Sequence, residues 1–313
     1  MLRNRGITAT MLLATALGGA CAPDADTDAA DMASRDTAAA AQDRAAPFTI
    51  TDAAFQTPES VLHDEQADVY LVSNINGGPL ERDDNGFIAR VRPDGSVEQL
   101  NWIDGAAENV TLNAPKGMAI IGDTLFVADI DTVRAFHRSN GTPLGARAVA
   151  GVSFLNDLTA QDGVLYVTDT GVGAAFASTG TEAIHRFDGA NATSVASGTE
   201  LAGPNGIAFR NGELLMAPFG GNAIWRIPLD GGAPEQIATL PSGGLDGLVV
   251  LDDGSLLVSS WEGQAVYRVS ADGQATAIAE NIEAPADIGW DASRRRVLIP
   301  LFMGNAIEVR EVR

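Results

Sequence analysis

The amino-acid sequence predicts an all-β protein, a six-bladed β-propeller in which each blade is a four-stranded antiparallel sheet. Three observations support this fold class. A short phrase of residues recurs six times, tight turns recur at equivalent places in the repeats, and the last repeat is one strand short. The interval between copies runs from 40 residues (Pro115 to Leu155) to 57 residues (Pro58 to Pro115), which is typical of four-stranded propeller blades.

The recurring phrase begins with Pro or Leu, continues with a residue that is usually polar and with a small or acidic one, and then opens an apolar run. Its clearest copy is Pro204-Asn205-Gly206-Ile207. The other copies are Pro58-Glu59-Ser60-Val61, Pro115-Lys116-Gly117-Met118, Leu155-Asn156-Asp157-Leu158, Leu245-Asp246-Gly247-Leu248 and Pro285-Ala286-Asp287-Ile288. Because each copy opens the first strand of a blade, we expect its second residue to point into one shared channel.

Tight turns divide each repeat into strands. In the fourth repeat, strands are expected at 206–209, 214–217, 223–228 and 235–239, with Asn211-Gly212 between the first two and Asp230-Gly231 between the last two. Asn-Gly and Asp-Gly favour the positive φ angles that two-residue hairpins need. Equivalent turns elsewhere are Asp94-Gly95, Gly122-Asp123, Asn140-Gly141, Asp162-Gly163, Asp188-Gly189, Asp253-Gly254 and Asp272-Gly273.

Both ends of the repeat region are expected to complete blade six. The sixth repeat ends at Asn305–Arg313 after only three strands, and the run Phe48–Thr51 precedes the first copy of the phrase. We predict that Phe48–Thr51 supplies the missing outer strand, because closing the ring removes exposed sheet edges.

The face at which first strands begin is expected to carry the ligand-selecting residues. The longest insertions, Asn74–Phe87 and Asp169–Ala183, both join a second strand to a third, which places them at this face as selecting loops or as decoration. Phe219, Trp261 and Phe302 follow second strands and are expected at the same channel mouth. There they would pack either against an apolar ligand or between blades.

The first 46 residues predict export. Residues 1–20 read as a signal peptide, with a positive start, an apolar run from Ile7 to Leu17 and small residues before Cys21. This arrangement resembles the lipobox of bacterial lipoproteins, which implies lipidation of Cys21 and a periplasmic protein anchored to the outer membrane. Removal of this cysteine by ordinary cleavage is the alternative. Residues 21–46, rich in Ala and Asp, are expected to form a disordered tether before the propeller at 47–313.

The charge of the chain restricts its partners. Twenty Lys and Arg residues against 41 Asp and Glu residues give a formal net charge of −21. Such a field repels phosphate backbones, so we expect no nucleic-acid partner. We expect a monomer that acts on a small molecule and contacts the membrane only through its N-terminal lipid. The single cysteine excludes an intrachain disulfide.

The inward residues of the six phrases predict a metal site. In chain order they are Glu59, Lys116, Asn156, Asn205, Asp246 and Ala286. Four of them offer oxygen, two as carboxylates and two as amides, which matches one divalent cation. Ca²⁺ fits such a set best because it takes six to eight oxygen ligands in irregular geometry, with Zn²⁺, Mg²⁺ and Mn²⁺ left open. Three histidines and one cysteine argue against a zinc site rich in nitrogen or sulfur.

The remaining candidates have weaker patterns. Lys116 would either bind a carboxylate of the substrate or direct its ammonium away from the channel. Ala286 offers no ligand, although its neighbour Asp287 could reach the channel or a nearby backbone group. His63, His137 and His185 share no spacing within the repeats, so we expect them to be non-catalytic. Gly171-Val172-Gly173 is too short a glycine pattern to predict nucleotide binding.

The ordered set Glu59, Asn156, Asn205 and Asp246 resembles the metal ligands of the regucalcin (senescence marker protein, SMP-30) and gluconolactonase family, also described as LRE-like. This family of six-bladed propellers is related to calcium-dependent organophosphate hydrolases, and the resemblance covers residues 48–313. It implies a divalent metal at the channel centre and hydrolysis of a lactone or related ester.

A mechanism follows as a hypothesis. Asp246 would be both a metal ligand and the general base, while Asn156 and Asn205 orient the oxygens of the substrate. Phe219 and Trp261, with Lys116, complete the expected substrate site. The alternative is a non-enzymatic propeller that binds a ligand or protein and whose channel metal is structural, because propellers host both kinds of function.

Overall fold

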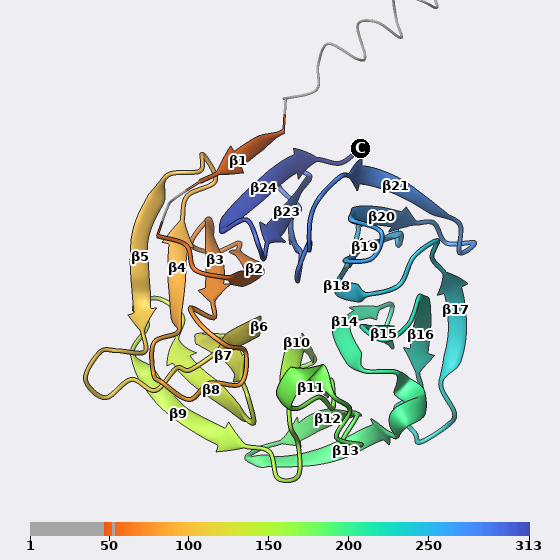
Figure 1. The fold of residues 1–313 in the computed structure, drawn as a ribbon, viewed down its shortest axis with the longest axis horizontal. Helices are drawn as coiled ribbons and strands as arrows, with labels where there is room; N and C mark the ends of the chain where they lie inside the picture. The colour runs from red at the N-terminus through yellow and green to blue at the C-terminus, as the bar shows by residue number, and fades with distance from the viewer. Residues whose placement is uncertain (1–46, 52–53) are drawn as a thin grey trace, which may run out of the picture. The chain divides into compact units, whose positions relative to one another are not determined.

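The computed structural model describes residues 47–51 and 54–313, which form a ring of six four-stranded antiparallel sheets (Figure 1). This confirms the predicted six-bladed β-propeller. The expected signal peptide (1–20), the lipidation site Cys21 and the tether (21–46) lie outside the described residues. Within the described part, no helix has the length and apolar character needed to cross a membrane.

Each blade runs from an inner strand at the ring's centre to an outer strand at its rim (Figure 1). Blades one to three comprise β2 (Pro58–Asp64), β3 (Val69–Asn74), β4 (Phe87–Val91), β5 (Val97–Asp104), β6 (Pro115–Ile121), β7 (Thr124–Asp129), β8 (Thr132–His137), β9 (Pro143–Ala148), β10 (Leu155–Gln161), β11 (Val164–Asp169), β12 (Ala183–Asp188) and β13 (Asn191–Ser197). Blades four to six comprise β14 (Pro204–Arg210), β15 (Glu213–Pro218), β16 (Ala223–Ile227), β17 (Glu235–Thr239), β18 (Leu245–Val250), β19 (Leu256–Ser260), β20 (Ala265–Val269), β21 (Ala275–Glu280), β22 (Gly289–Asp291), β23 (Arg296–Leu301), β24 (Ala306–Glu311) and β1 (Phe48–Ile50). Two short 3-10 helices, η1 (Ala174–Phe176) and η2 (Thr199–Leu201), lie in connections of blade three.

The predicted turns adopt the backbone conformation that their residues favour. Asn211 and Gly212 have φ angles of 52° and 81° between β14 and β15, and Gly231 has a φ of 87° between β16 and β17. Turns of this kind keep the consecutive strands of a blade adjacent. The strand order within blades one to five therefore follows the sequence order.

Blade six is closed by both ends of the described chain. β1 pairs antiparallel with β24, with Phe48 opposite Val309 and Ile50 opposite Ile307. Ile50 is buried in the same apolar cluster as Ile307 and Val309. The prediction that residues 48–51 supply the outer strand of blade six is therefore confirmed, and β1 covers the edge that β24 would otherwise expose.

The core lies between neighbouring blades rather than on the channel axis. One apolar cluster joins Leu215 of blade four to Leu245 and Tyr267 of blade five, and equivalent clusters join the other pairs. Inner strands are almost entirely buried, whereas outer strands such as β9 are largely exposed. This gradient explains why the inner strands read as apolar runs in the sequence.

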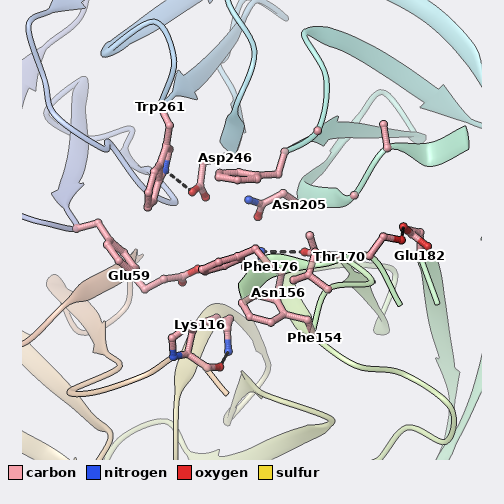
Figure 2. A pocket seen from close by; sticks show the side chains of 18 of the residues that line it. Glu59, Lys116, Phe154, Asn156, Thr170, Phe176, Glu182, Asn205, Asp246 and Trp261 are labelled. Atoms are coloured by element: carbon pink, nitrogen blue, oxygen red, sulfur yellow. Dashed lines mark hydrogen bonds between the residues drawn. The ribbon is translucent and has the colours of Figure 1, made fainter. Parts of the chain in front are cut away.

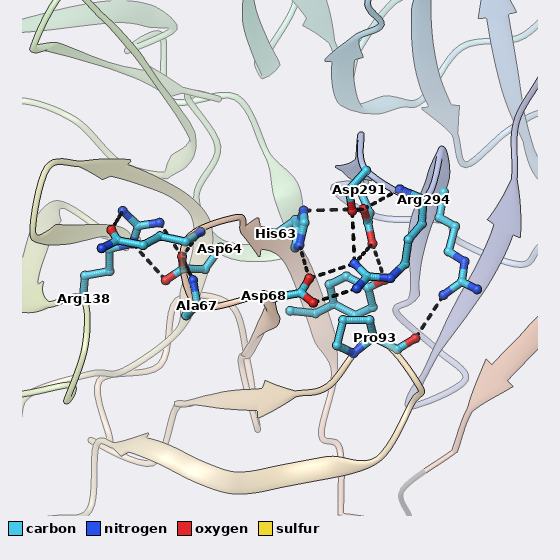
Figure 3. A network of polar contacts seen from close by, with 12 residues as sticks. His63, Asp64, Ala67, Asp68, Pro93, Arg138, Asp291 and Arg294 are labelled. Carbon is cyan, nitrogen blue, oxygen red and sulfur yellow. Dashed lines mark hydrogen bonds and ion pairs between the residues drawn. The ribbon is translucent and has the colours of Figure 1, made fainter.

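Polar contacts at the far ends of the inner strands link blades six, one and two (Figure 3). The Tyr70 hydroxyl of blade one donates a hydrogen bond to Asp291 of blade six at 2.7 Å. Arg294 of blade six forms an ion pair with Asp68, and Arg138 of blade two forms one with the buried Asp64. These contacts join blade six to blade one and blade one to blade two.

Candidate active site

A β-bulge at the start of the inner strand directs the polar residue of each phrase toward the channel in blades one to five. In β14, Pro204 pairs with Pro218 and the regular register resumes at Ile207, so Asn205 and Gly206 lie in the bulge. The same register shift follows Pro58, Pro115, Leu155 and Leu245. A bulge re-aims a side chain that regular pleating would send elsewhere.

The bulges bring five of the six predicted inward side chains to one pocket of about 540 Å³ (Figure 2). They are Glu59, Lys116, Asn156, Asn205 and Asp246. Each has at most 5% of its surface exposed, so the site is well shielded from bulk water. Ala286, the sixth, is buried and does not line the pocket.

Four side-chain oxygens at the channel axis have no hydrogen-bond partner. They are Glu59 Oε2, Asn156 Oδ1, Asn205 Oδ1 and Asp246 Oδ1. Leaving a buried polar atom unpaired costs about 1–3 kcal/mol, and more for a charged one, so four together are unusual in a folded protein. They belong to the same four residues that the sequence predicts as metal ligands.

Neighbouring side chains hold these groups in place. Asn156 donates from Nδ2 to the Thr170 hydroxyl at 3.0 Å, and Thr170 donates to the carbonyl of Pro204 at 2.8 Å. Trp261 donates from Nε1 to Asp246 Oδ2 at 2.7 Å. In each case one polar atom is engaged with the protein wall and the other, Asn156 Oδ1 or Asp246 Oδ1, is left for a ligand.

The electrostatics of the site favour a cation. Burial, together with repulsion from Asp246 and Asp287, raises the pKa of Glu59. Burial and repulsion from Asp287 likewise raise the pKa of Asp246. Hydrogen bonds from the Trp261 and Asn205 side chains act in the opposite direction but do not outweigh them. Both shifts express the difficulty of keeping two carboxylates ionised in a water-poor channel. A bound cation would favour the ionised forms and relieve that difficulty.

The ammonium of Lys116 only partly offsets the negative charge of these carboxylates, because backbone carbonyls hold it at the pocket wall. Nζ donates to the carbonyls of Ala114 at 2.9 Å and Pro79 at 3.2 Å and lies 4.4 Å from the centre of the Phe154 ring. Burial lowers the pKa of Lys116 to about 8, while Glu59 opposes that shift. Lys116 is fully buried and lines the pocket, so it does not leave the channel, and its role toward a substrate carboxylate stays a prediction.

The donor set fits a hard divalent cation. Two carboxylates and two amide oxygens are ligands that Ca²⁺ accepts, and all four come with an unpaired buried oxygen. The described residues contain no group of three or more His, Cys, Asp or Glu side chains placed to hold a metal ion. A site rich in histidine or cysteine, of the kind typical of zinc, is therefore not found in that part of the chain.

The pocket wall above the axis is largely aromatic. Phe219 and Trp261 lie with ring centroids 5.5 Å apart, and Trp261 and Phe302 lie 5.1 Å apart. All three line the pocket, as the sequence predicts for residues that follow second strands. Trp261 also contacts Asp246, which the sequence did not indicate.

Both long insertions reach this pocket. Ile75 and Pro79 come from the insertion of blade one, and Val172 and Phe176 come from that of blade three. The predicted placement of the insertions over the channel mouth is confirmed. Glu182, at the end of the second insertion, also lines the pocket and has an unpaired buried Oε2.

Sequence analysis missed two functional candidates, Thr170 and Glu182. Thr170 directly follows β11, and Glu182 directly precedes β12. Both lie in the insertion, whose residues cannot be aligned with equivalent positions in the other blades. Their position inside the longest loop at the mouth face was the one available signal.

The other singled-out residues lie away from the pocket. Asp157 accepts hydrogen bonds from the backbone of Leu158 and Ile207, which links blades three and four. Asp287 accepts a hydrogen bond from Ser60 at 2.5 Å, which links blades six and one. His63, His137 and His185 do not line the pocket.

Comparison with known proteins places the fold. No family model matches the chain, and no curated protein matches it. A gluconolactonase from Xanthomonas campestris has a TM-score of 0.63 and 21% identity, covering 86% of this chain and 96% of its own. A proposed gluconolactonase has a TM-score of 0.64 and 18% identity, covering 84% and 91%. This chain shares the fold of gluconolactonases.

The same fold also occurs in an enzyme of another class. A virginiamycin B lyase from Staphylococcus aureus, solved as a catalytically inactive histidine-to-alanine variant with quinupristin, has a TM-score of 0.57 and 15% identity. The match covers 85% of this chain and 99% of the lyase. Likeness at these identities establishes the six-bladed architecture, while the chemistry depends on the residues in the pocket.

Proposed function

We propose that this protein is a hydrolase of the gluconolactonase type that opens a lactone or related ester with the help of one divalent cation, Ca²⁺ being the best fit. The observation that carries this proposal is the convergence of four unpaired, buried oxygens on one channel axis. They belong to Glu59, Asn156, Asn205 and Asp246. The shared fold with gluconolactonases supports the same reaction class.

Glu59, Asn156, Asn205 and Asp246 would hold the cation. When bound, it would polarise the substrate carbonyl and make water a better nucleophile at neutral pH. The chain itself contributes the shielding: aromatic side chains such as Trp261 and Phe302 cover the axis and exclude bulk water, which strengthens every electrostatic interaction inside.

Asp246 acts as the general base in this proposal. Trp261 engages Oδ2, so Oδ1, the oxygen that would also face the cation, is the one that would accept a proton from the attacking water. The ring C–O bond breaks as the new C–O bond forms, and the accepted proton passes to the departing alkoxide. The product is a hydroxy acid. The role of Asn156 and Asn205 in orienting the substrate stays a prediction, because their unpaired amide oxygens would face the cation.

Elimination of the lyase type is less well supported. The inactive state of the S. aureus lyase is a histidine-to-alanine variant. In this chain none of the three histidines lines the pocket. Carboxylate and amide groups are available instead, and hydrolysis can use them without a histidine.

Metal and substrate dependence test the proposal together. Purified protein stripped with a chelator should lose acid release from a panel of lactones, aryl esters and phosphoesters, and Ca²⁺ should restore it. Saturating Ca²⁺ should also raise the melting temperature by about 5 °C or more, because it binds only the folded state. Activity that survives thorough chelation would contradict the proposed role of the metal.

Asp246→Asn should reduce acid release about 100-fold or more while the protein stays folded, since it removes the base and one charged ligand. Asp230→Asn, in an exposed turn, is the matched control and should behave as wild type. Calcium-dependent melting without turnover of any substrate in the panel would favour the alternative, a non-enzymatic binding propeller with a structural metal.

A further inference from the structure

The wall of the axial pocket is apolar on opposite sides. Phe219, Trp261 and Phe302 form a continuous row contributed by blades four, five and six. Phe154 and Phe176 of blade three face the pocket as a second pair, with ring centroids 6.3 Å apart. Aromatic walls bind apolar surface well because each ring offers a large, rigid contact area.

Phe176 is held at the pocket in an unfavourable backbone conformation. It ends the 3-10 helix η1, and both Ala175 and Phe176 have φ angles of 55°, in the left-handed region that non-glycine residues seldom adopt. The Phe176 ring lines the pocket, yet 61% of the residue is exposed. An apolar ligand in the pocket would cover this ring, and strain of this kind is typical of ligand-binding loops.

The hydroxyl groups of the wall are already engaged. The Thr170 hydroxyl donates to the carbonyl of Pro204 at 2.8 Å, and the Ser178 hydroxyl donates to Glu182 Oε1 at 2.7 Å. The Lys116 ammonium donates to two backbone carbonyls. A polyhydroxylated ligand would therefore bury hydroxyl groups against rings with few partners, which is unfavourable.

Glu182 is the exception in this wall. Its side chain is buried at 6% exposure, Oε1 accepts from Ser178, and Oε2 has no partner. The carboxylate packs on Gly171, where a Cβ would lie 2.6 Å from Glu182 Cγ. Figure 2 shows Glu182 apart from the axial oxygens, on the blade-three side of the pocket. An unpaired, buried carboxylate oxygen that belongs to the pocket lining can accept a hydrogen bond from a donor group of a ligand.

We propose that the substrate is a lactone or ester with an apolar, ring-sized body and one hydrogen-bond donor, such as an amide N–H, that Glu182 accepts. The inference rests on the hydrolase function proposed above for the axial site. It distinguishes this protein's substrate from a sugar lactone, because beyond the four axial oxygens the wall offers rings and one unpaired acceptor instead of an array of polar partners for hydroxyl groups.

Binding of three probes to protein stripped of metal by a chelator tests the inference independently of turnover, because the proposed ester hydrolysis needs the cation. Three cyclopentanone analogues serve as probes: one carries a phenylacetamido group, one the phenylacetoxy group in which oxygen replaces the N–H, and one only hydroxyl groups. Calorimetric titration of the wild-type protein should give the tightest binding for the amide, roughly tenfold tighter than for the oxygen counterpart. The polyol should bind more weakly than either.

Glu182→Met keeps the length of the side chain and removes both acceptor oxygens, so it should abolish the preference for the amide over its oxygen counterpart. Glu200→Met, at an exposed position of η2 outside the pocket, is the matched control and should keep the preference. The comparison of the three probes on wild-type protein stands even if Glu182→Met fails to fold.

The outcomes separate this inference from the hydrolase proposal. Equal binding of the amide and its oxygen counterpart to wild-type protein, or tighter binding of the polyol, would overturn it. Equal preferences in the Glu182→Met and Glu200→Met proteins would also overturn the assignment of Glu182. Selective binding of the amide together with no lactone turnover would support the ligand class while contradicting hydrolysis.

Discussion

Trp261 belongs both to the apolar wall and to the polar axis. Its ring packs between Phe219 and Phe302, while its N–H engages Asp246 Oδ2. A single side chain thus fixes the orientation of the proposed base and shields it from water. The sequence placed this residue at the mouth, yet only the structure shows the hydrogen bond.

Trp261→Phe separates these two roles. The variant keeps an aromatic ring in the row and loses the hydrogen bond to Asp246, so we expect kcat to fall about tenfold with little change in KM, as for the loss of one hydrogen bond to a charged group. Steady-state kinetics on the best substrate of the panel measure both constants. Trp290→Phe is the control, because the Trp290 N–H is unpaired. An increase in KM alone would show that Trp261 acts only by packing.

Glycine in the phrase has a packing role that its backbone angles do not reveal. A Cβ on Gly206 would lie 2.2 Å from the carbonyl oxygen of Asp246 and 2.8 Å from the nitrogen of Leu248. Blade five therefore approaches the backbone of blade four directly. Gly117 and Gly247 meet their next blades in the same way.

Gly206→Ala should destabilise the protein by about 1–3 kcal/mol, because the added methyl group pushes two blades apart. Urea unfolding monitored by circular dichroism gives the free energy. At Gly221 a Cβ would meet nothing closer than 3.3 Å, so Gly221→Ala should have a smaller effect. Similar stability of the two variants would show that the blade contact yields easily.

At the scale of elements, removal of β1 should lower the melting temperature of the protein. It covers the edge of β24 and buries Ile50 against Ile307 and Val309. A protein that begins at Thr51 should melt at least about 5 °C below one that begins at Pro47, since it loses this burial and exposes a sheet edge. Calorimetry and light scattering compare the two. Equal melting temperatures would mean that three strands suffice to close blade six.

At the scale of the whole molecule, the polar contacts of Figure 3 connect the last blade to the first. Burial raises the pKa of Asp291, but hydrogen bonds from Ser293, Tyr70 and Arg294 outweigh it and lower the pKa to about 2. Because the folded value is the lower one, this carboxylate stabilises the ring above the pKa of an unfolded aspartate, near 4. The stabilisation is lost as the pH falls from about 4 to about 2.

The free energy of unfolding of the wild type should therefore fall by up to about 2 kcal/mol more than that of Asp291→Asn between pH 5 and pH 2. Chemical denaturation at a series of pH values measures the difference. Asp188→Asn, at the exposed end of β12, provides a comparison. Parallel pH profiles for the wild type and Asp291→Asn would show that the blade-closing network has no such linkage.

Repetition explains why so much was visible in the sequence. Six copies of one phrase and the recurring Asn-Gly and Asp-Gly turns determine the number of blades, because these signals are local and each acts on its own backbone. Equivalent positions in equivalent blades must meet on the ring's axis. Glu59, Asn156, Asn205 and Asp246 could therefore be grouped although the first and the last lie 187 positions apart in the sequence.

Tertiary structure alone decided what surrounds those four side chains. Thr170 and Glu182 come from an insertion without a repeat register, and the Lys116 ammonium is turned by carbonyls that include Pro79 of another blade. Such contacts depend on how loops from different blades fold over one mouth, which no local pattern encodes. The sequence by itself determined the ring, its axial oxygens and the aromatic row at the mouth, whereas the facing pair Phe154 and Phe176 and the unpaired Glu182 arose only from packing between distant segments.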